Sequence, residues 1–157
     1  MSKYAIFAIA GEEFGVDLDK VFEIARPLKT TPLPNTPSFI TGVINLRGAV
    51  IPLLDMRKRL NVEPSPQEER ILIVMIRGEK IGLLVDAVRQ ILHIDKKEIS
   101  SPPAIFKGLK PEYLSGIGKS GDRLIIILNI DNLLTPEEIM LLGSLSGNPV
   151  KDKKGGN

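Results

Sequence analysis

The chain carries the segment IAGEEFGV at residues 9–16 and repeats it as IRGEKIGL at residues 76–83, an offset of 67 positions. Each copy consists of an apolar run, a turn that contains Gly-Glu, and a second apolar run, which is the pattern of a β-hairpin. Self-similarity at a fixed offset is typical of a fold in which one unit is built twice. The sequence therefore predicts two related subdomains.

A second match follows in the same order. FITGV at residues 39–43 aligns with YLSGI at residues 113–117, and the offset grows to 74 because the second copy carries extra residues before Tyr113. We place the pseudo-repeats at about residues 3–66 and 67–142 of a single domain that covers residues 3–142. Units of roughly 70 residues are marginal alone, so we expect their apolar faces to pack into one shared hydrophobic core. The sequence leaves open whether strands are exchanged at the boundary.

Short apolar runs rich in β-branched residues are the main secondary-structure signal. Their length of about five or six residues favours buried strands over helices. These runs occupy residues 49–54, 71–76, 80–85 and 124–128. Frequent glycine and proline residues separate them, as in a β-sandwich or a β-barrel. The sequence predicts an all-β fold with only short helices.

Two helices are predicted. Residues 55–60 form one or two turns, and a longer helix begins at Thr135-Pro136-Glu137-Glu138 and ends near Leu142. The second start combines a capping hydroxyl, a proline at the first helical position and acidic residues that face the helix dipole. Residues 143–157 are rich in glycine and lysine, so we expect a flexible C-terminal tail.

The composition excludes several kinds of site. The 157 residues include no cysteine and one histidine, His93, which rules out disulfides, thiolate zinc sites and sites that need two histidines. We expect no metal, no cofactor and no catalytic residue, and we interpret His93 as an exposed or half-buried strand residue. A net charge of +2 argues against a dedicated nucleic-acid binder.

Membrane signals are also missing from the sequence pattern. Glu12 and Glu13 interrupt the first apolar stretch, so we expect no signal peptide. A spanning helix needs about 18 consecutive apolar residues, and the chain has no such run. We expect a cytoplasmic protein that does not insert directly into a membrane.

Three charged or glycine-rich motifs favour structural interpretations. GIGKSG at residues 116–121 matches G-x-G-x-x-G, but it leads into an apolar strand and not into a helix, which predicts a hairpin turn. Asp19 and Asp86 are repeat equivalents, so we expect them to share one turn or strand-end role. The basic run at residues 57–59 is explained by one turn of solvated helix.

Arg47 and Glu23 stand out as candidates for contact with a partner. Arg47 lies between two apolar stretches, and the second repeat has Gly121 at the same place, so the fold as such does not demand an arginine. The pattern fits a simple turn residue and a polar handle for a partner equally well. Glu23 lies beside Val21 on a segment that fits either an exposed edge or an ordinary half-buried strand.

The segment FITGVINLRGAVIPLLD at residues 39–55 resembles the signature of the CheW family of chemotaxis coupling proteins. The resemblance continues through residues 13–17, 82–86 and 113–118 and spans about residues 3–142. It implies two SH3-like five-stranded β-barrels packed on a common hydrophobic core, in agreement with the core that the repeat predicts.

The resemblance implies a non-enzymatic adaptor. Members of the family bind the regulatory domain of the histidine kinase CheA and the cytoplasmic tips of chemoreceptors, and so couple receptors to the kinase in arrays at the inner face of the membrane. The motif match places the receptor-binding groove at Arg47, Val21, Glu23 and Ile91. It places corners that support the kinase-binding faces at Gly42 and Gly116.

Other functions are left open by the residues alone. The chain could serve as a CheW-like scaffold module of another two-component or motility pathway, or as the regulatory domain of the kinase itself. An SH3-like nucleic-acid-binding module has little support, because aromatic residues make up only 4% of the chain and the charge is balanced. An enzyme that uses carboxylates would need a pair of acidic side chains that the sequence alone does not bring together.

Overall fold

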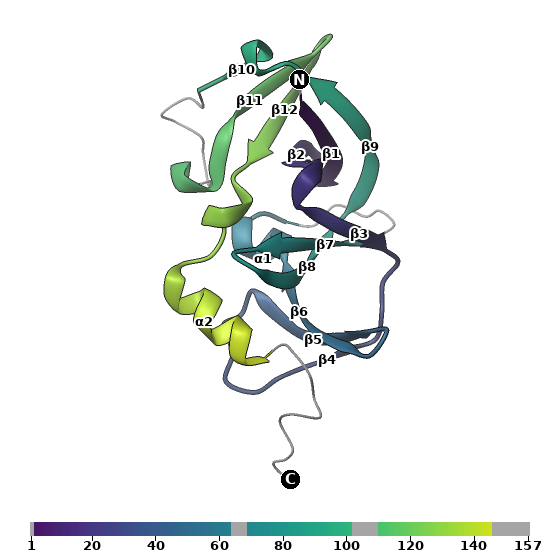
Figure 1. The fold of residues 1–157 in the computed structure, drawn as a ribbon, viewed down its shortest axis with the longest axis vertical. Helices are drawn as coiled ribbons and strands as arrows, with labels where there is room; N and C mark the ends of the chain where they lie inside the picture. Colours follow the sequence, from purple (N-terminus) through teal and green to yellow (C-terminus); the bar gives the residue numbers. More distant parts are fainter. Residues whose placement is uncertain (1, 64–68, 102–109, 146–157) are drawn as a thin grey trace.

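The computed structural model describes residues 2–63, 69–101 and 110–145 (Figure 1). Twelve strands and two α-helices are connected by short loops and four 3₁₀ turns. The strands are β1 Ser2–Ile9, β2 Glu12–Asp17, β3 Val21–Ala25, β4 Thr30–Thr31, β5 Ile40–Leu46, β6 Ala49–Asp55, β7 Arg70–Ile76, β8 Glu79–Val85, β9 Ala87–Ile94, β10 Ile99–Ser100, β11 Leu114–Ser120 and β12 Arg123–Leu128. The helices are α1 Met56–Leu60 and α2 Pro136–Leu145, and the 3₁₀ turns are η1 Leu18–Lys20, η2 Lys96–Glu98, η3 Pro111–Tyr113 and η4 Ile130–Asn132.

The strands form two six-stranded sheets that cut across the sequence repeats. Sheet A has the order β10-β11-β12-β2-β1-β9, and sheet B has the order β3-β7-β8-β6-β5-β4. The first hairpin of each repeat, β1–β2 or β7–β8, therefore belongs to the sheet that the other repeat completes. Figure 1 shows sheet A in the upper half of the molecule and sheet B in the lower half, with α2 along one side of sheet B. The strand exchange that the sequence left open is present.

The repeat is visible in the register of the two parallel strand pairs. Ile127 of β12 is opposite Gly15 of β2, and Leu53 of β6 is opposite Gly82 of β8. These are the same positions in the two repeats. A Cβ atom added to either glycine would lie 3.1 Å from the side chain of the residue opposite, Ile127 or Leu53. Glycine at each place thus lets the exchanged hairpin pack closely against its host sheet.

Three apolar clusters fill the interior. Tyr4, Ile6, Ile94, Ile125 and Ile127 pack together on one face of sheet A, and Ile44, Ile51, Leu53, Ile71 and Ile73 pack on one face of sheet B. The opposite faces of both sheets meet in a larger cluster that also includes residues of the helices and turns. Alternate residues of a strand point to opposite faces, so strands buried on both sides have the continuous apolar runs seen in the sequence.

The predicted all-β class and the shared core are confirmed. Each sheet has six strands and not five, because the two-residue strands β4 and β10 add to its edge. The glycine motif forms a hairpin as predicted: Ser120 and Arg123 are paired across a turn in which Gly121 has a φ of 63°.

The basic run at residues 57–59 is not a solvated helix face, and this prediction is wrong. The Arg57 side chain is only 11% exposed, and its Nη1 donates to Asp86 Oδ1 at 2.9 Å. It also donates to Asp55 and to Glu69. The hydrogen bond to Asp55 is the largest of several causes that raise the pKa of Arg57 far above its ordinary value. Of these three residues only Lys58 is exposed.

Asp86 does not share a role with Asp19. Asp86 is fully buried, whereas Asp19 is exposed. Its Oδ2 accepts a hydrogen bond of 2.7 Å from the backbone N–H of Ala10, at the tip of the β1–β2 hairpin. Because Arg57 follows β6 in sheet B, the Asp86 carboxylate links the exchanged hairpin of sheet A to the end of sheet B. Sequence equivalence failed here because the two aspartates meet different neighbours after strand exchange.

Helix α2 begins as predicted. The Thr135 hydroxyl accepts from the Glu138 N–H, and Glu138 accepts from the Thr135 N–H, which is a capping box. The helix continues to Leu145, three residues past the predicted end at Leu142. The prediction that a flexible tail begins at residue 143 is therefore wrong for residues 143–145, which are helical. Residues 146–157 lie outside the described part of the chain.

Replacing Asp86 with alanine should destabilise the fold strongly. The change leaves the buried Arg57 guanidinium and the Ala10 N–H without this acceptor, and breaking a buried ion pair costs about 3 kcal/mol or more of unfolding free energy. Denaturant unfolding of Asp86→Ala measures this cost. The matched control is Asp19→Ala, at the equivalent exposed position, for which we expect a change within about 0.5 kcal/mol. Equal effects of the two variants would contradict the assigned network.

The whole chain should unfold in one transition. Neither sheet can be completed by one repeat, because each contains strands from both. We expect far-UV circular dichroism and intrinsic tyrosine fluorescence to report the same midpoint in urea. A fragment covering residues 1–66 should lack cooperative unfolding. Two separated midpoints, or a stably folded fragment, would refute interdependence of the sheets.

Candidate functional site

One outermost strand of each sheet carries exposed apolar side chains. β3 ends sheet B and β9 ends sheet A, and the two are equivalent strands of the repeat. Ile24 on β3 is 42% exposed, and its equivalent Ile91 on β9 is 52% exposed. Phe22 on β3 is 52% exposed as well. Large apolar side chains on the outermost strand of a sheet are unusual without a partner, which makes these strands the first candidates for an interaction surface.

A β-bulge explains the exposure of Phe22. The pairing of β3 with β7 shifts register between Val21 and Glu23, so Phe22 is the extra residue. Val21 on one side of it packs against the shared core, whereas Glu23 on the other side is half-buried. Bulges re-aim side chains in this way. Nothing in the sequence pattern marks this register shift.

Arg47 and Glu23 form a bidentate ion pair. Nη1 of Arg47 donates to Oε1 of Glu23 at 2.8 Å, and Nη2 donates to Oε2 at 2.6 Å. The hydrogen bond from Arg47 is the main reason that the pKa of Glu23 lies below its usual value. Arg47 stands at the tip of the β5–β6 hairpin with a φ of 52°, followed by Gly48 at 88°. Arg47 is thus both a turn residue and a charged group fixed in one orientation.

This ion pair joins strand β3 to the turn of the β5–β6 hairpin within sheet B. Glu23 belongs to β3, the first strand in the order, and Arg47 follows β5, the fifth. The pairing therefore helps close the sheet on itself without backbone hydrogen bonds. The Arg47 side chain remains 67% exposed, so one face of the guanidinium stays accessible. The sequence predicted both residues for the site but not that they contact each other.

The four residues predicted for the receptor groove are divided between the two sheets. Arg47 and Glu23 are in direct contact, and Val21 lies two residues from Glu23 with its side chain partly in the core. Ile91 lies in sheet A, where it is opposite Ala5 of β1. A shared receptor groove stays a prediction for all four residues.

Gly42 and Gly116 are equivalent glycines at which a short edge strand approaches closely. A Cβ atom on Gly42 would lie 2.2 Å from the carbonyl oxygen of Thr31 in β4. A Cβ atom on Gly116 would lie 2.6 Å from the carbonyl oxygen of Ser100 in β10. Both glycines also coincide with register shifts, so they bend β5 and β11. Their role in shaping corners that support kinase-binding faces stays a prediction.

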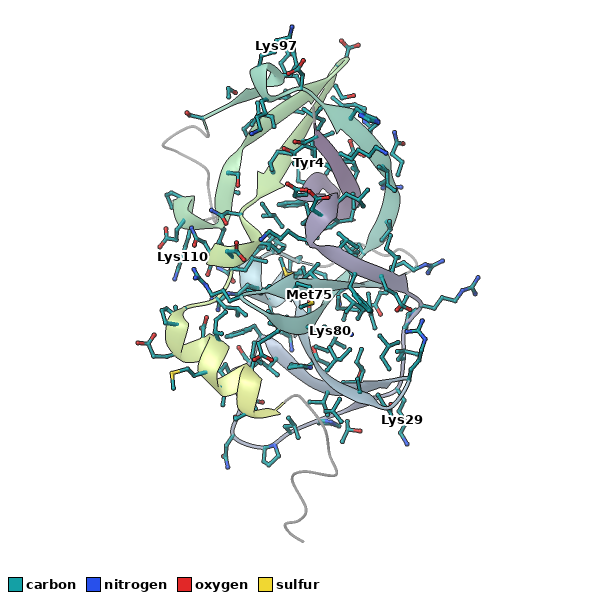
Figure 2. The ribbon with its side chains drawn as sticks, viewed as in Figure 1. Tyr4, Lys29, Met75, Lys80, Lys97 and Lys110 are labelled. Atoms are coloured by element: carbon teal, nitrogen blue, oxygen red, sulfur yellow. The ribbon has the colours of Figure 1, made fainter. Side chains whose placement is uncertain are left out.

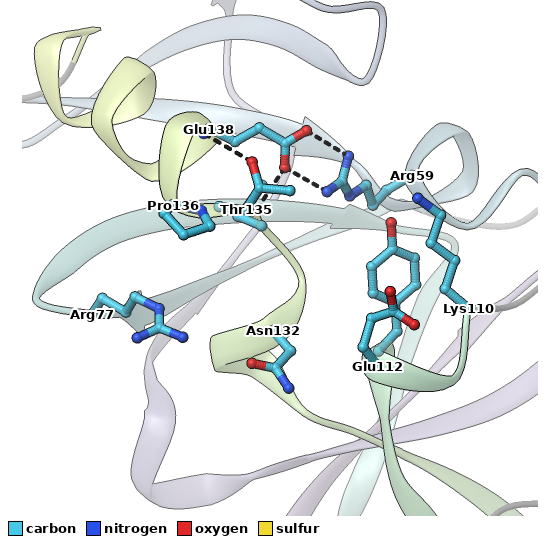
Figure 3. Close-up of a pocket in the computed structure, with 10 residues that line it drawn as sticks. Arg59, Arg77, Lys110, Glu112, Asn132, Thr135, Pro136 and Glu138 are labelled. Carbon is cyan, nitrogen blue, oxygen red and sulfur yellow. Dashed lines mark hydrogen bonds and ion pairs between the residues drawn. The ribbon is translucent and has the colours of Figure 1, made fainter.

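A cleft of about 330 Å³ lies where α2 begins (Figure 3). Two of its charged residues, Arg59 and Glu138, hold the fold. Arg59 pairs with Glu138 at 2.5 Å and donates from Nε to the carbonyl oxygen of Leu133, while Glu138 also completes the capping box. The Arg59 guanidinium lies 4.3 Å from the centre of the Phe39 ring. These contacts fix α2 to α1.

No group of three metal-ligating side chains occurs among the described residues. His93 is exposed on β9, in agreement with its interpretation as a strand residue. Within the same residues, no helix has both the length and the apolar character needed to cross a membrane.

Comparison with known proteins supports an interaction module. Residues 3–138 match a family model that is described as "CheW-like domain". The chain belongs to the CheW family. Chemotaxis protein CheW of Klebsiella aerogenes is 36% identical over 146 residues, which cover 92% of this chain and 88% of that protein. Chemotaxis protein CheW of Bacillus subtilis is 32% identical over 86% of this chain and 88% of its own length.

The family assignment extends to three dimensions. The crystal structure of the scaffolding protein TtCheW from Thermoanaerobacter tengcongensis superimposes with a TM-score of 0.81 at 37% identity, over 87% of this chain and 96% of that one. These three relatives are named as chemotaxis or scaffolding proteins. The chain is accordingly a CheW-family chemotaxis scaffold, with two SH3-like subdomains as in that family's fold.

Gly42→Ala should destabilise the protein by about 2 kcal/mol or more. The added methyl group would overlap the Thr31 carbonyl, and relief requires movement of the β4 backbone. Thermal and denaturant unfolding measure the loss. Gly48→Asn is the control, since Gly48 has open space around its Cβ position and asparagine tolerates a positive φ. A Gly42→Ala variant as stable as the control would show that the corner is not constrained.

Proposed function

We propose that the protein is a non-enzymatic adaptor that couples chemoreceptors to the histidine kinase CheA. The observation that carries the proposal is the surface of β3, where a fixed Arg47–Glu23 ion pair lies beside the exposed side chains of Phe22 and Ile24. It combines apolar area with oriented charge, which is the composition of binding hot spots. The receptor tip is its proposed partner.

The ion pair prepares Arg47 for binding before the partner arrives. A free arginine side chain loses rotamer freedom when it is immobilised at an interface, and this loss opposes binding. Two charge-assisted hydrogen bonds to Glu23 already hold the guanidinium in the unbound protein. A partner acceptor can then use the remaining donors of the accessible face. The same contact neutralises Glu23, which would otherwise disfavour an apolar neighbour.

The kinase requires separate surfaces. Gly42 and Gly116 hold the edge strands β4 and β10, which are not hydrogen-bonded neighbours of β3 and β9. We assign these edges to the regulatory domain of CheA, on the strength of the family resemblance. Two related but unequal edges allow head-to-tail contacts with a domain of similar shape. Receptor and kinase can then bind the same molecule at once.

Coupling by this route needs differential contacts and no chemical step. A receptor that contacts the adaptor differently in its two signalling states changes the relative free energies of the kinase states attached to it. The protein would act in the cytoplasm, at the inner face of the membrane, through its place in the receptor array. Neither the two CheW proteins nor TtCheW is named as an enzyme or as a nucleic-acid-binding protein.

Arg47→Ala should weaken receptor binding roughly thirtyfold while the melting temperature changes by no more than about 2 °C. The side chain is exposed and its ion pair is screened by water, so the fold depends little on it. The measurements are the melting temperature, and titration with a purified receptor cytoplasmic fragment and separately with the CheA regulatory domain. CheA binding should be unchanged.

The matched control is Arg123→Ala, which removes another bidentate arginine–glutamate pair, Arg123–Glu13 in sheet A. This variant should bind the receptor fragment like the parent. A large drop in melting temperature for Arg47→Ala would make the residue structural. Normal folding with unchanged receptor binding would refute the assignment of this surface, and failure of the parent to bind either partner would refute the adaptor itself.

A further inference from the structure

At three positions that the repeat makes equivalent, sheet A and sheet B have side chains of different charge and polarity. In sheet A, Arg123 donates from Nε and Nη2 to the two carboxylate oxygens of Glu13, both at 3.0 Å, and the charge of Arg89 also acts on Glu13. The repeat offsets align Glu13 with Lys80 and Arg123 with Ala49. The matched parallel registers show that these alignments hold in space. Arg89 aligns with Phe22.

Sheet B therefore lacks the ion pair that occupies this place in sheet A. In its position lies a hollow of about 270 Å³. The residues that line the hollow are Ala49, Val50, Ile51, Met75, Gly78, Glu79 and Lys80. Met75 and Lys80 are direct partners across β7 and β8, and Figure 2 shows both side chains near the middle of the molecule. The lining is mainly apolar and includes two charged residues, Glu79 and Lys80.

Lys80 connects the hollow with the β3 surface. Its Nζ lies 3.8 Å from the centre of the Phe22 ring, a cation–π contact. No ion pair joins Lys80 to a carboxylate within the described residues. Arg47 and Lys80 together supply two positive charges around Glu23, which supplies one negative charge. The carboxylate of Glu79, the other charged residue of the lining, lies 3.3 Å from the position of a Cβ atom built on Gly143 of α2. Lys80 thus places an ammonium group that no described ion pair neutralises next to an apolar hollow.

We propose that this hollow, with Lys80 and Phe22, is a docking subsite for a partner segment in which an apolar side chain stands next to a carboxylate. The apolar side chain would enter the hollow, and the carboxylate would pair with Lys80. The inference rests on the proposed function, because Phe22 and Glu23 make the subsite continuous with the receptor surface. It adds a specificity determinant: the partner has to be acidic at this point.

A second copy of the chain is a poorer occupant. The equivalent of Val50 in sheet A is Leu124, which is 63% exposed and could fill an apolar hollow. Its neighbour Arg123 is already paired with Glu13, so a second copy would bring no unpaired carboxylate to Lys80 at this contact. Charge complementarity instead favours an acidic partner.

The repeat supplies a variant that closes the hollow with a pair the fold already uses. Ala49→Arg combined with Lys80→Glu copies the Arg123–Glu13 pair into sheet B. We expect this double variant to melt within a few degrees of the parent and to bind the receptor cytoplasmic fragment at least about tenfold more weakly. Binding to the CheA regulatory domain should be unchanged, and Leu124→Ala, in sheet A, should bind both partners normally.

Two single variants separate shape from charge. Ala49→Leu fills the hollow and keeps Lys80, and Lys80→Gln keeps the hollow and removes the charge. Both should weaken receptor binding, and only Lys80→Gln should reduce its dependence on salt concentration. If all these variants bind like the parent while Arg47→Ala does not, the subsite is wrong and the receptor surface stands.

Other outcomes also decide the proposal. If the parent binds no receptor fragment, the failure lies in the proposed function. Should sedimentation show that the parent self-associates and that Ala49→Leu abolishes this, the occupant is a second copy and not the receptor. A double variant that fails to fold is replaced by Ala49→Leu and Lys80→Gln, each of which tests one half of the subsite alone.

Discussion

Burial of both faces of the central strands is the constraint on which this structure depends. One face of each sheet packs on its own cluster, and the other face joins the core between the sheets. Each sheet therefore needs the other to bury its second face. Strand exchange adds a covalent link, because each sheet contains strands of both repeats. Buried Asp86 then satisfies Ala10 and Arg57, one from each side of this interface. The result is a rigid support on which edge strands can be exposed.

The features that were predicted from sequence are those that local patterns determine. Aliphatic runs of five to seven residues, turn glycines and the capping box at Thr135 specify strands, hairpins and a helix start without reference to distant residues. The internal repeat also predicted a contact between residues distant in sequence, namely a core shared by two similar halves. Strand exchange could not be predicted, because the hairpins of the two repeats are alike and either could complete either sheet.

The errors and omissions concern partners that are distant in sequence. Arg57 meets Asp86 across 29 positions and Arg59 meets Glu138 across 79, so a short basic helix that looked solvated is largely buried. The Arg47–Glu23 pair spans 24 positions. Each residue of this pair was identified through the family signature, but only the fold shows that they contact each other. The exposure of Phe22 depends on a bulge for which the sequence has no marker.

Positions at which the two repeats differ are the candidates for functional residues, because the fold does not require the same side chain in both copies. Positions that maintain the core have kept their character, as Gly15 and Gly82 show by their matching contacts. Positions at the rim have not: a closed arginine–glutamate pair in sheet A corresponds to alanine, lysine and an open hollow in sheet B. Because the sheet A pair shows that the fold accommodates closure, the open form in sheet B is not a requirement of folding. The docking subsite that we propose in sheet B thus corresponds to a position that sheet A uses for structure.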